Sequence, residues 1–339
     1  MNSGVKFSIV GCGRIGFRHA EHITNQAELS AVCDIDKNAL KKMKDKYPDV
    51  KVYDNIDSML DDDKDSQVVN ICTPNGLHAE HTIKALKKGK HVVCEKPMAL
   101  TVKDAQRMND AAKNERKHLF IVKQNRFNPP VQELRKAIDN GKIGKIYSVQ
   151  LNCFWNRNEQ YYEESPWKGK KDLDGGILFT QFSHFIDLLY WFIGDVRDVK
   201  VISKNYNHKG FIEFGDTLVA IMEFESGAVA TMNCTINSFQ RNMEGSLTIF
   251  GEKGTVKIGG QYLNVLEYQK FADYYIENPK ECRPANDYGY YHGSMSNHDK
   301  IIENVIDVLT NNGKIATNGF EGMKTVEIIE KIYSKINCI

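Results

Sequence analysis

IVGCGRIGFRH (residues 9–19) has the pattern of a buried strand that stops at glycines and continues as a helix. Gly11, Gly13 and Gly16 fit the spacing G-x-G-x-x-G. In a dinucleotide site the first glycine permits a tight turn, the second lets backbone approach the pyrophosphate, and the third lets the helix pack on the strand. Taken alone, the spacing fits a structural turn equally well.

Asp34 favours the dinucleotide interpretation. The segment AVCDID (31–36) ends the second expected strand and places Asp34 18 residues after Gly16. A carboxylate at this point accepts hydrogen bonds from ribose hydroxyls and repels a 2′-phosphate. We therefore predict a dinucleotide site that prefers NAD to NADP.

The chain changes character near Asn128-Pro129-Pro130. Before it, short apolar runs alternate with helical stretches, which predicts a parallel sheet covered on both faces. The expected strands span 5–10, 29–34, 67–73, 90–96 and 118–122, with a helix over 78–89. After it we expect a helix over 131–140, a strand over 145–156, one apolar helix over 177–194, hairpins within 217–236 and 246–260, and helices over about 297–311 and 320–336. Strands in succession predict an α+β domain with a mostly antiparallel sheet.

The composition excludes several classes of protein. Among 339 residues, 45 Lys and Arg nearly cancel 44 Asp and Glu, which argues against a nucleic-acid partner. The eight cysteines are scattered without a CxxC pair, so we expect a reducing compartment and no metal site. The sequence has no charged-then-apolar leader and no apolar run of about 18 residues. We expect a cytoplasmic protein without a membrane partner.

CEKPMA (94–99) is the first candidate for chemistry. It lies at the carboxyl end of an expected core strand, the edge where open parallel sheets bind ligands. Pro97 favours an extended conformation at Lys96, which can direct the lysine into the crevice. A lysine near a nicotinamide cation exchanges a proton more readily with a substrate hydroxyl. A strand-exit turn with a solvated lysine is the alternative.

Four segments in this order resemble the Gfo/Idh/MocA oxidoreductases: IVGCGRIGFRH, CTPNGLH (72–78), EKPMAL (95–100) and DGGILFTQFSHFIDLL (174–189). The likeness covers essentially the whole chain. It implies an NAD(P)-dependent dehydrogenase of a sugar or sugar-like alcohol. It also implies an NAD-binding Rossmann domain over 1–123, followed by an α+β substrate-binding and oligomerisation domain over 124–339. Whether the C-terminal helices pack back on the first domain is left open.

The resemblance also implies site residues. Lys96 corresponds to the active-site lysine and His184 to the second-domain histidine, although on its apolar helix His184 alone is more typical of a core residue. Many members have Asp four residues before this histidine, where Thr180 stands here. Lys96 and His184 are therefore expected to carry the proton transfer. The expected cofactor contacts are Gly11, Gly13, Arg14, Ile15, Gly16, Asp34, Thr73, Pro74, Asn75, His78, Glu95 and Lys96.

A finer resemblance is to the WlbA/WbpB-like branch, which oxidises UDP-2-acetamido-2-deoxyglucuronate at C3. It is carried by VKQNRFNPPV (122–131), NCFWNRNEQYY (152–162), GGILFTQFSHF (175–185) and YYHGSMSNH (290–298). Arg157 suits a uronate carboxylate because guanidinium pairs bidentately with it; a surface ion pair is the alternative. The 290–298 segment either holds the diphosphate and uridine or is a polar helix entry with Ser296 or Asn297 as N-cap. The expected substrate contacts are Lys96, Lys123, Asn125, Arg126, Arg157, Thr180, Gln181, His184, Tyr291, Ser294, Ser296, Asn297 and His298.

This resemblance implies an NAD-dependent 3-dehydrogenase of a UDP-2-acetamido-uronate in surface-polysaccharide nucleotide-sugar synthesis. Enzymes of this branch resemble one another in reoxidising NAD with 2-oxoglutarate. The alternatives are a UDP-GlcNAc 3-dehydrogenase, a free-sugar or inositol dehydrogenase, and a non-enzymatic sensor of NAD or sugar. By likeness to the family we expect a homo-oligomer, either a tetramer or a dimer.

Overall fold

The computed structural model describes residues 4–277, 279, 282, 284–287, 289 and 291–336. The chain forms two compact units. The first combines Met1–Val122 with His298–Val326, and the second combines Lys123–Asn297 with Glu327–Ile339. Helix α10 (His298–Asn311) thus belongs to the first unit, and α11 (Gly319–Ser334) is divided between the two.

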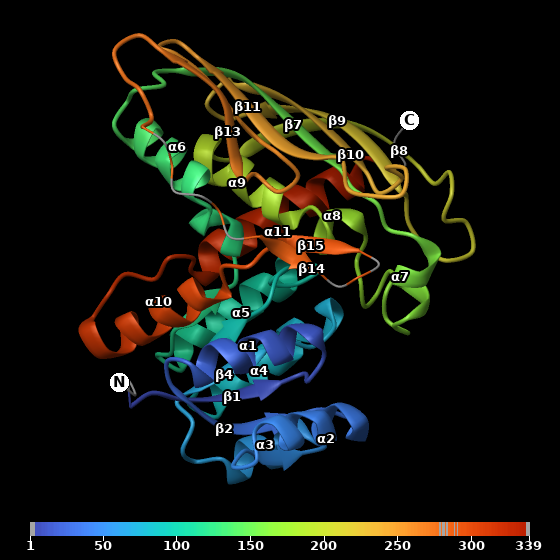
Figure 1. Ribbon diagram of the computed structural model, residues 1–339, viewed down its shortest axis with the longest axis vertical. Helices are drawn as coiled ribbons and strands as arrows, with labels where there is room; N and C mark the ends of the chain where they lie inside the picture. Colours follow the sequence, from blue (N-terminus) through green and yellow to red (C-terminus); the bar gives the residue numbers. More distant parts are fainter. Residues whose placement is uncertain are drawn as a thin grey trace. The chain divides into compact units, whose positions relative to one another are not determined.

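In its described residues the first unit holds a six-stranded parallel sheet in the order β3-β2-β1-β4-β5-β6 (Figure 1). Its strands are β1 (Lys6–Val10), β2 (Glu28–Cys33), β3 (Lys51–Tyr53), β4 (Val68–Ile71), β5 (His91–Cys94) and β6 (Leu119–Ile121). Its helices are α1 (Arg14–Thr24), α2 (Lys37–Lys46), α3 (Ile56–Asp62), the 3₁₀ turn η1 (Asn75–Leu77), α4 (His78–Lys87) and α5 (Val102–Asn114). Every residue of β4 is buried, as expected for a sheet covered on both faces. The predicted parallel α/β domain is confirmed, while β3 was not predicted.

Two glycines make the first strand–helix turn possible. Gly11 has φ +98°, and a Cβ there would lie 2.5 Å from the carbonyl oxygen of Cys72. A Cβ on Gly16 would lie 2.0 Å from the Gly11 carbonyl oxygen. A side chain at either position would therefore push α1 away from the sheet.

In the part of the second unit that the structure describes, a seven-stranded sheet has the order β13-β12-β11-β7-β10-β9-β8. The strands are β7 (Ile146–Phe154), β8 (Val196–Lys204), β9 (Thr217–Phe224), β10 (Val229–Thr235), β11 (Glu244–Gly251), β12 (Gly254–Gly259) and β13 (Val265–Phe271); β14 (Ala285–Asp287) pairs separately with β15 (His292–Met295). Neighbouring strands of the large sheet are antiparallel except β10 and β7, which are parallel. The predicted mostly antiparallel sheet is confirmed, including both hairpins.

Helices cover one face of this sheet, as Figure 1 shows for α6, α8 and α9. The remaining elements of the unit are η2 (Gln124–Phe127), α6 (Pro129–Asp139), α7 (Glu159–Glu163), α8 (Ile177–Thr180) and α9 (Ser183–Ile193). The prediction of a single helix over 177–194 is wrong, because α8 and α9 are separate helices. The backbone N–H groups of Gln181 and Phe182 both donate to the carbonyl of Ile177, which widens the turn and starts a new helix just before His184. Across the residues described, helices that combine the length and apolar character needed to cross a bilayer are absent.

Candidate active site

The amino end of α1 offers bare backbone. Gly13 is the N-cap and, among the described residues, has no side-chain cap hydrogen bond, and the first turn carries no acidic residue. A Cβ on Gly13 would meet no described atom within 4 Å. Arg14 and Ile15 form the first turn. Free N–H groups and the helix dipole at such an end favour a phosphate.

Asp34 is fixed beside this turn. Its Oδ2 accepts a hydrogen bond from the Cys12 N–H at 2.6 Å, and its Oδ1 accepts one from the Asp36 N–H at 2.8 Å. The side chain remains partly exposed at the carboxyl end of β2. The glycine turn and this carboxylate thus fit the pyrophosphate and ribose of NAD.

His78 connects two turns at the same edge of the sheet. Its Nδ1 lies 2.7 Å from the Pro97 carbonyl oxygen and its Nε2 lies 2.8 Å from that of Thr73. Burial lowers the pKa of His78, although both carbonyls favour the protonated ring. Pro74 and the buried Asn75 lie between Thr73 and His78. The side chain of His78 therefore supports the loop around these residues.

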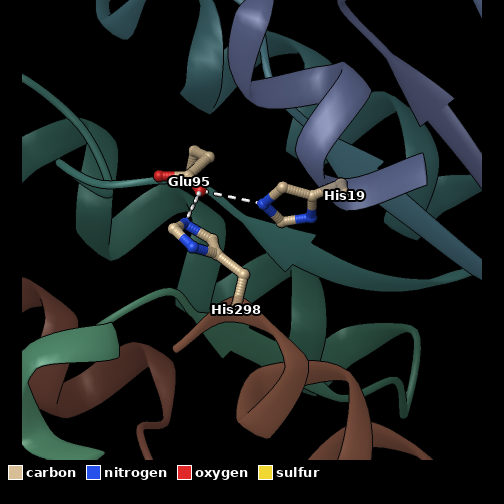
Figure 2. Close-up of side chains that lie close together, drawn as sticks. All are labelled: His19, Glu95 and His298. Carbon is tan, nitrogen blue, oxygen red and sulfur yellow. Dashed lines mark hydrogen bonds and ion pairs between the residues drawn. The ribbon is translucent and has the colours of Figure 1, made fainter. Parts of the chain in front are cut away.

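Lys96 follows β5 and is partly exposed. Its N–H donates to Oε2 of Glu95 at 3.0 Å, and the Lys96–Pro97 peptide bond is cis. Glu95 is buried, and its other oxygen contacts His19 and His298 (Figure 2). The carboxylate expected to contact the cofactor is thus held by groups of the protein.

His184 is the second residue of α9 and is buried. Its Nε2 lies 3.3 Å from Nε2 of Gln124 in η2. Because the amide nitrogen can only donate, this contact matches a neutral imidazole whose Nε2 is an acceptor. Such a ring is able to take up a proton.

Asp187, one turn after His184, was not singled out from the sequence. Arg126 donates to it through two nitrogens, Nε to Oδ2 at 2.8 Å and Nη2 to Oδ1 at 2.9 Å. Nζ of Lys123 lies 3.6 Å from the same carboxylate. All three side chains are buried. The two-pronged face of Arg126 is therefore used within the second unit.

Two buried amides have unsatisfied polar atoms. In the described structure, neither Nδ2 nor Oδ1 of Asn125 has a hydrogen-bond partner, and the same holds for Oε1 of Gln181. Nε2 of Gln181 contacts the Tyr161 hydroxyl at 3.3 Å. Because buried polar atoms without partners cost free energy, these amides are suited to a polar ligand.

Thr180 occupies the position where many family members have Asp. Its hydroxyl hydrogen-bonds the buried carboxylate of Asp174, which also accepts the Gly169 N–H at 2.7 Å. Burial raises the pKa of Asp174 to about 6. Asp174 was also missed, because a contact between residues six positions apart, at the entry to α8, gives no periodic signal.

Arg157 lies inside a cage of aromatic rings. Its guanidinium carbon is 5.0 Å from the ring centre of Trp155, 5.2 Å from that of Tyr161 and 5.1 Å from that of Tyr291. The side chain is 3% exposed, so the alternative of a surface ion pair is wrong. Lys168 adds a second cation, with Nζ 3.8 Å from the ring centre of Tyr161.

The hydrogen bonds of Arg157 are all to neutral groups. Nη1 donates to the Asn156 carbonyl at 2.5 Å and to Oδ1 of Asn242 at 3.2 Å. Nε has no partner, and Arg157 forms no ion pair with a carboxylate of the described residues. The cage thus holds a buried cation without a counter-ion in that part of the chain.

Residues 291–297 contact other segments of the second unit. Tyr291 packs edge-on against Tyr161 at 5.0 Å. Asn297 Nδ2 donates to the Gln124 carbonyl at 3.2 Å and to Oδ1 of Asn128 at 2.8 Å. Ser296 is partly exposed, and the side chain of Ser294 lies outside the described residues.

Comparison with known proteins places these features in a family. Residues 5–123 match the oxidoreductase family model with an NAD-binding Rossmann fold, and residues 131–257 match the GFO/IDH/MocA C-terminal domain. The chain belongs to the Gfo/Idh/MocA oxidoreductase family. It is accordingly an NAD-dependent sugar dehydrogenase.

Two solved Gfo/Idh/MocA structures are similar over nearly the whole chain. One is the WlbA dehydrogenase from Bordetella pertussis in complex with NADH and UDP-GlcNAcA, with TM-score 0.90, 34% identity and coverage of 99% of this chain and 97% of that chain. The other is the WlbA dehydrogenase from Chromobacterium violaceum with the same ligands, with TM-score 0.88, 36% identity and coverage of 98% and 93%. By sequence, the D-glucoside 3-dehydrogenase of Escherichia coli K12 is 31% identical over 67% of this chain and 69% of its own.

Proposed function

We propose that this protein oxidises the C3 hydroxyl of UDP-2-acetamido-2-deoxy-glucuronate with NAD, in nucleotide-sugar synthesis for a surface polysaccharide. The observation that carries the proposal is the buried Arg157, which lacks a carboxylate partner among the described residues. The similarity to two structures that contain UDP-GlcNAcA supports it.

A substrate carboxylate would satisfy Arg157. The guanidinium already uses Nη1 on neutral oxygens, whereas Nε is available. An isolated buried cation is costly, and an anion in bidentate contact offsets that cost. The three rings lie about 5 Å from the guanidinium carbon and help to exclude water from it, which strengthens a charge–charge contact. A uronate supplies this carboxylate and a neutral UDP-sugar does not.

Lys96 and His184 are the proposed proton acceptors for the C3 hydroxyl. NAD, when bound at the glycine turn, supplies the hydride acceptor. Lys96 has its backbone fixed by Glu95, and His184 has its ring fixed by Gln124. A lysine accepts a proton only in its neutral form, and a neighbouring positive charge favours that form. One of the two side chains takes the hydroxyl proton while the other holds the oxygen in place.

The remaining contacts are assigned to the rest of the substrate. Asn125 and Gln181 have polar atoms that a sugar hydroxyl or acetamido group would satisfy. We keep Lys123, Arg126 and Thr180 as proposed contacts of the sugar, or as supports of the residues that contact it. Ser294 and Ser296 remain proposed contacts of the diphosphate. Asn297 supports η2 through its two hydrogen bonds.

The second candidate function is oxidation of a neutral sugar, either UDP-GlcNAc or a free sugar. The relationship to a D-glucoside 3-dehydrogenase favours this candidate. A free sugar would leave the proposed diphosphate contacts, Ser294 and Ser296, without a ligand, and either neutral substrate would leave Arg157 without an anion.

The deciding experiment follows the absorbance of NADH with a panel of substrates. Purified protein is given NAD and UDP-GlcNAcA, UDP-GlcNAc, D-glucose or myo-inositol, each with and without 2-oxoglutarate. We expect NADH formation with UDP-GlcNAcA, and 2-oxoglutarate is the proposed reoxidant. Faster turnover of a neutral sugar would refute the uronate assignment, and failure of all substrates would favour a sensor.

We also propose a homo-oligomer, a tetramer or a dimer, formed through the outer face of the second sheet. Large apolar side chains lie exposed there on neighbouring strands, for example Ile202 (61% exposed) on β8 and Ile221 (56% exposed) on β9. Exposed apolar faces of this kind mark association surfaces. Light scattering on the wild type and on I221K measures whether this face forms the interface; an unchanged mass would contradict the proposal.

A further inference from the structure

Glu95 is a buried carboxylate that stands directly before Lys96 in the chain. It is 5% exposed. Its Oε1 lies 2.8 Å from Nε2 of His19 and 3.3 Å from Nε2 of His298 (Figure 2). Its Oε2 accepts the N–H of Lys96 at 3.0 Å. A buried carboxylate is tolerated only when it is paired in this way.

A hydrogen bond from Asn70 sets the orientation of the His19 ring. Nδ2 of Asn70 donates to Nδ1 of His19 at 2.7 Å, which leaves the ring proton on Nε2, directed at Glu95. Asn70 lies on β4 and pairs with Val93 on β5, the strand that leads to Glu95. The four elements involved, α1, β4, β5 and the start of α10, all belong to the first unit.

The two imidazoles keep Glu95 ionised. Burial alone would raise the pKa of this carboxyl, but the interactions with His19 and His298 outweigh burial and hold the pKa well below its usual value. An ionised carboxylate can only accept hydrogen bonds. The Lys96 N–H is therefore drawn to Oε2, and the peptide plane that precedes Lys96 is fixed.

The other side of the turn is fixed independently. His78 contacts the Pro97 carbonyl, beyond Lys96. Glu95 and His78 thus hold the backbone before and after the lysine, and both are buried. The direction in which the Lys96 side chain leaves the backbone follows from these two anchors.

We infer that Glu95 is a positioning residue for Lys96, aligned by the hydrogen-bonded series Asn70–His19–Glu95, with the contact to His298 as a second support. The inference rests on the proposed role of Lys96 in proton transfer. Displacement of a reacting group by about 1 Å can lower a rate by about 10²-fold. Loss of the Glu95 charge is accordingly expected to act on kcat.

The same three side chains have the composition of a metal site, with ligand atoms within 4.8 Å of one another. The distances favour hydrogen bonds instead. Ligands about 2.0–2.2 Å from a tetrahedral zinc ion lie roughly 3.3 Å apart, whereas Glu95 Oε1 and His19 Nε2 are 2.8 Å apart. The proton that Asn70 places on His19 Nε2 also occupies the lone pair a metal would need.

Three variants and a matched control test the inference. E95Q keeps the shape but loses the charge, and H19L removes a donor. H19Q retains an N–H donor and is the conservative variant. H22Q is the control, because His22 is on the same helix and stacks on His298 at 6.4 Å without donating to Glu95.

Two readouts are measured in the full-length protein. With NAD and UDP-GlcNAcA as substrates, we expect E95Q and H19L to lower kcat by up to about 10²-fold and to leave KM for NAD unchanged. H19Q should retain most of the wild-type kcat, and H22Q should match wild type. In protein labelled with ¹⁵N-lysine, the Lys96 amide proton should move upfield in E95Q, since a neutral amide is the weaker acceptor. Thermal unfolding identifies variants that fail to fold. If E95Q or H19L does so, the comparison of H19Q with wild type tests the inference instead.

The outcomes separate this inference from the proposed function. If K96M keeps the wild-type rate, the role of Lys96 fails. If K96M loses activity while E95Q keeps both kcat and the Lys96 amide shift, the positioning role of Glu95 is overturned. Equal losses in H19Q and H19L would also overturn it, because they would show that the donor does not matter. A stoichiometric divalent metal in the purified protein would also overturn the positioning role, because it would show that His19, Glu95 and His298 form a metal site.

Discussion

Replacing Arg157 tests the substrate assignment most directly. The side chain is buried at 3% exposure, and its polar contacts in the described residues are to neutral oxygens. A hydrogen bond between charged groups contributes about 1.5–3 kcal/mol. At about 1.4 kcal/mol per tenfold change in affinity, R157A should weaken the binding of UDP-GlcNAcA by about 10–150-fold. UDP-GlcNAc, which has no carboxylate, should bind R157A about as well as wild type.

The assay compares Kd by calorimetry and kcat/KM by NADH absorbance for both sugars. R157K should recover only part of the loss, because lysine keeps the charge but neither the two-pronged geometry nor the stacking on Trp155, Tyr161 and Tyr291. R197A is the control, since Arg197 is half exposed in the same unit and pairs with Glu225. Its effect on either sugar should be negligible.

Equal losses for the two sugars would refute the reasoning. They would mean that Arg157 orders the cage or contacts the diphosphate. No loss for either sugar would show that the buried charge serves the protein alone. Thermal unfolding of R157A and R157K distinguishes a collapsed cage from a lost contact, because R157K retains a cation for the three rings.

Three further predictions concern other groups. D34S should narrow the preference for NAD over NADP, because it removes the charge that repels a 2′-phosphate; equal kcat/KM ratios in wild type and variant would contradict this. K96M and H184N should each leave NAD binding intact and lower turnover by about 10²–10⁴-fold, the scale of a lost acid–base group, and near-normal rates in both would place the chemistry elsewhere. Asp174 has its pKa raised to about 6 by burial, so the folded state binds its proton more tightly than the unfolded state. The free energy of unfolding should therefore decrease as pH rises from about 4 to about 6, because the contribution of this group is lost. D174N should remove this pH dependence, measured by urea titration at each pH; the same pH dependence in wild type and D174N would refute the prediction.

The first unit was largely predictable because its signals are local. Gly11 and Gly16 stand where any side chain would collide with backbone, so the sequence itself records the turn. Short apolar runs gave five of the strands. The exception is β3, which has three residues at the edge of the sheet and little buried surface to mark it.

The second unit was less predictable because its features depend on distant partners. Nothing in the apolar run 177–194 marks the break at Gln181 and Phe182, which arises from their shared acceptor, Ile177. The parallel pairing of β10 with β7 joins strands about 80 residues apart in the chain, for example Met232 with Leu151. Hydrophobic alternation predicts that a strand exists but not which neighbour it has.

The candidate site shows the same division. Asp34 could be proposed as a site residue because it follows a strand of a recognisable unit, and Lys96 because its segment also resembles the family. Asp174 and Asp187 were missed because their importance lies in the side chains they meet, Thr180 for the first and Arg126 with Lys123 for the second. An isolated aspartate in an apolar or glycine-rich segment carries no local pattern.

Arg126 and Arg157 show what the structure adds to such a reading. Both residues were expected from the sequence to contact substrate, and both are buried in the second unit. Arg126 already has its carboxylate, since Asp187 meets it through two hydrogen bonds. Arg157 has aromatic rings, neutral oxygens and an unused Nε. Because a buried cation without an anion is costly, the difference between the two environments supports the proposal that Arg157 receives the substrate carboxylate, while Arg126 holds α9, and with it His184, against η2.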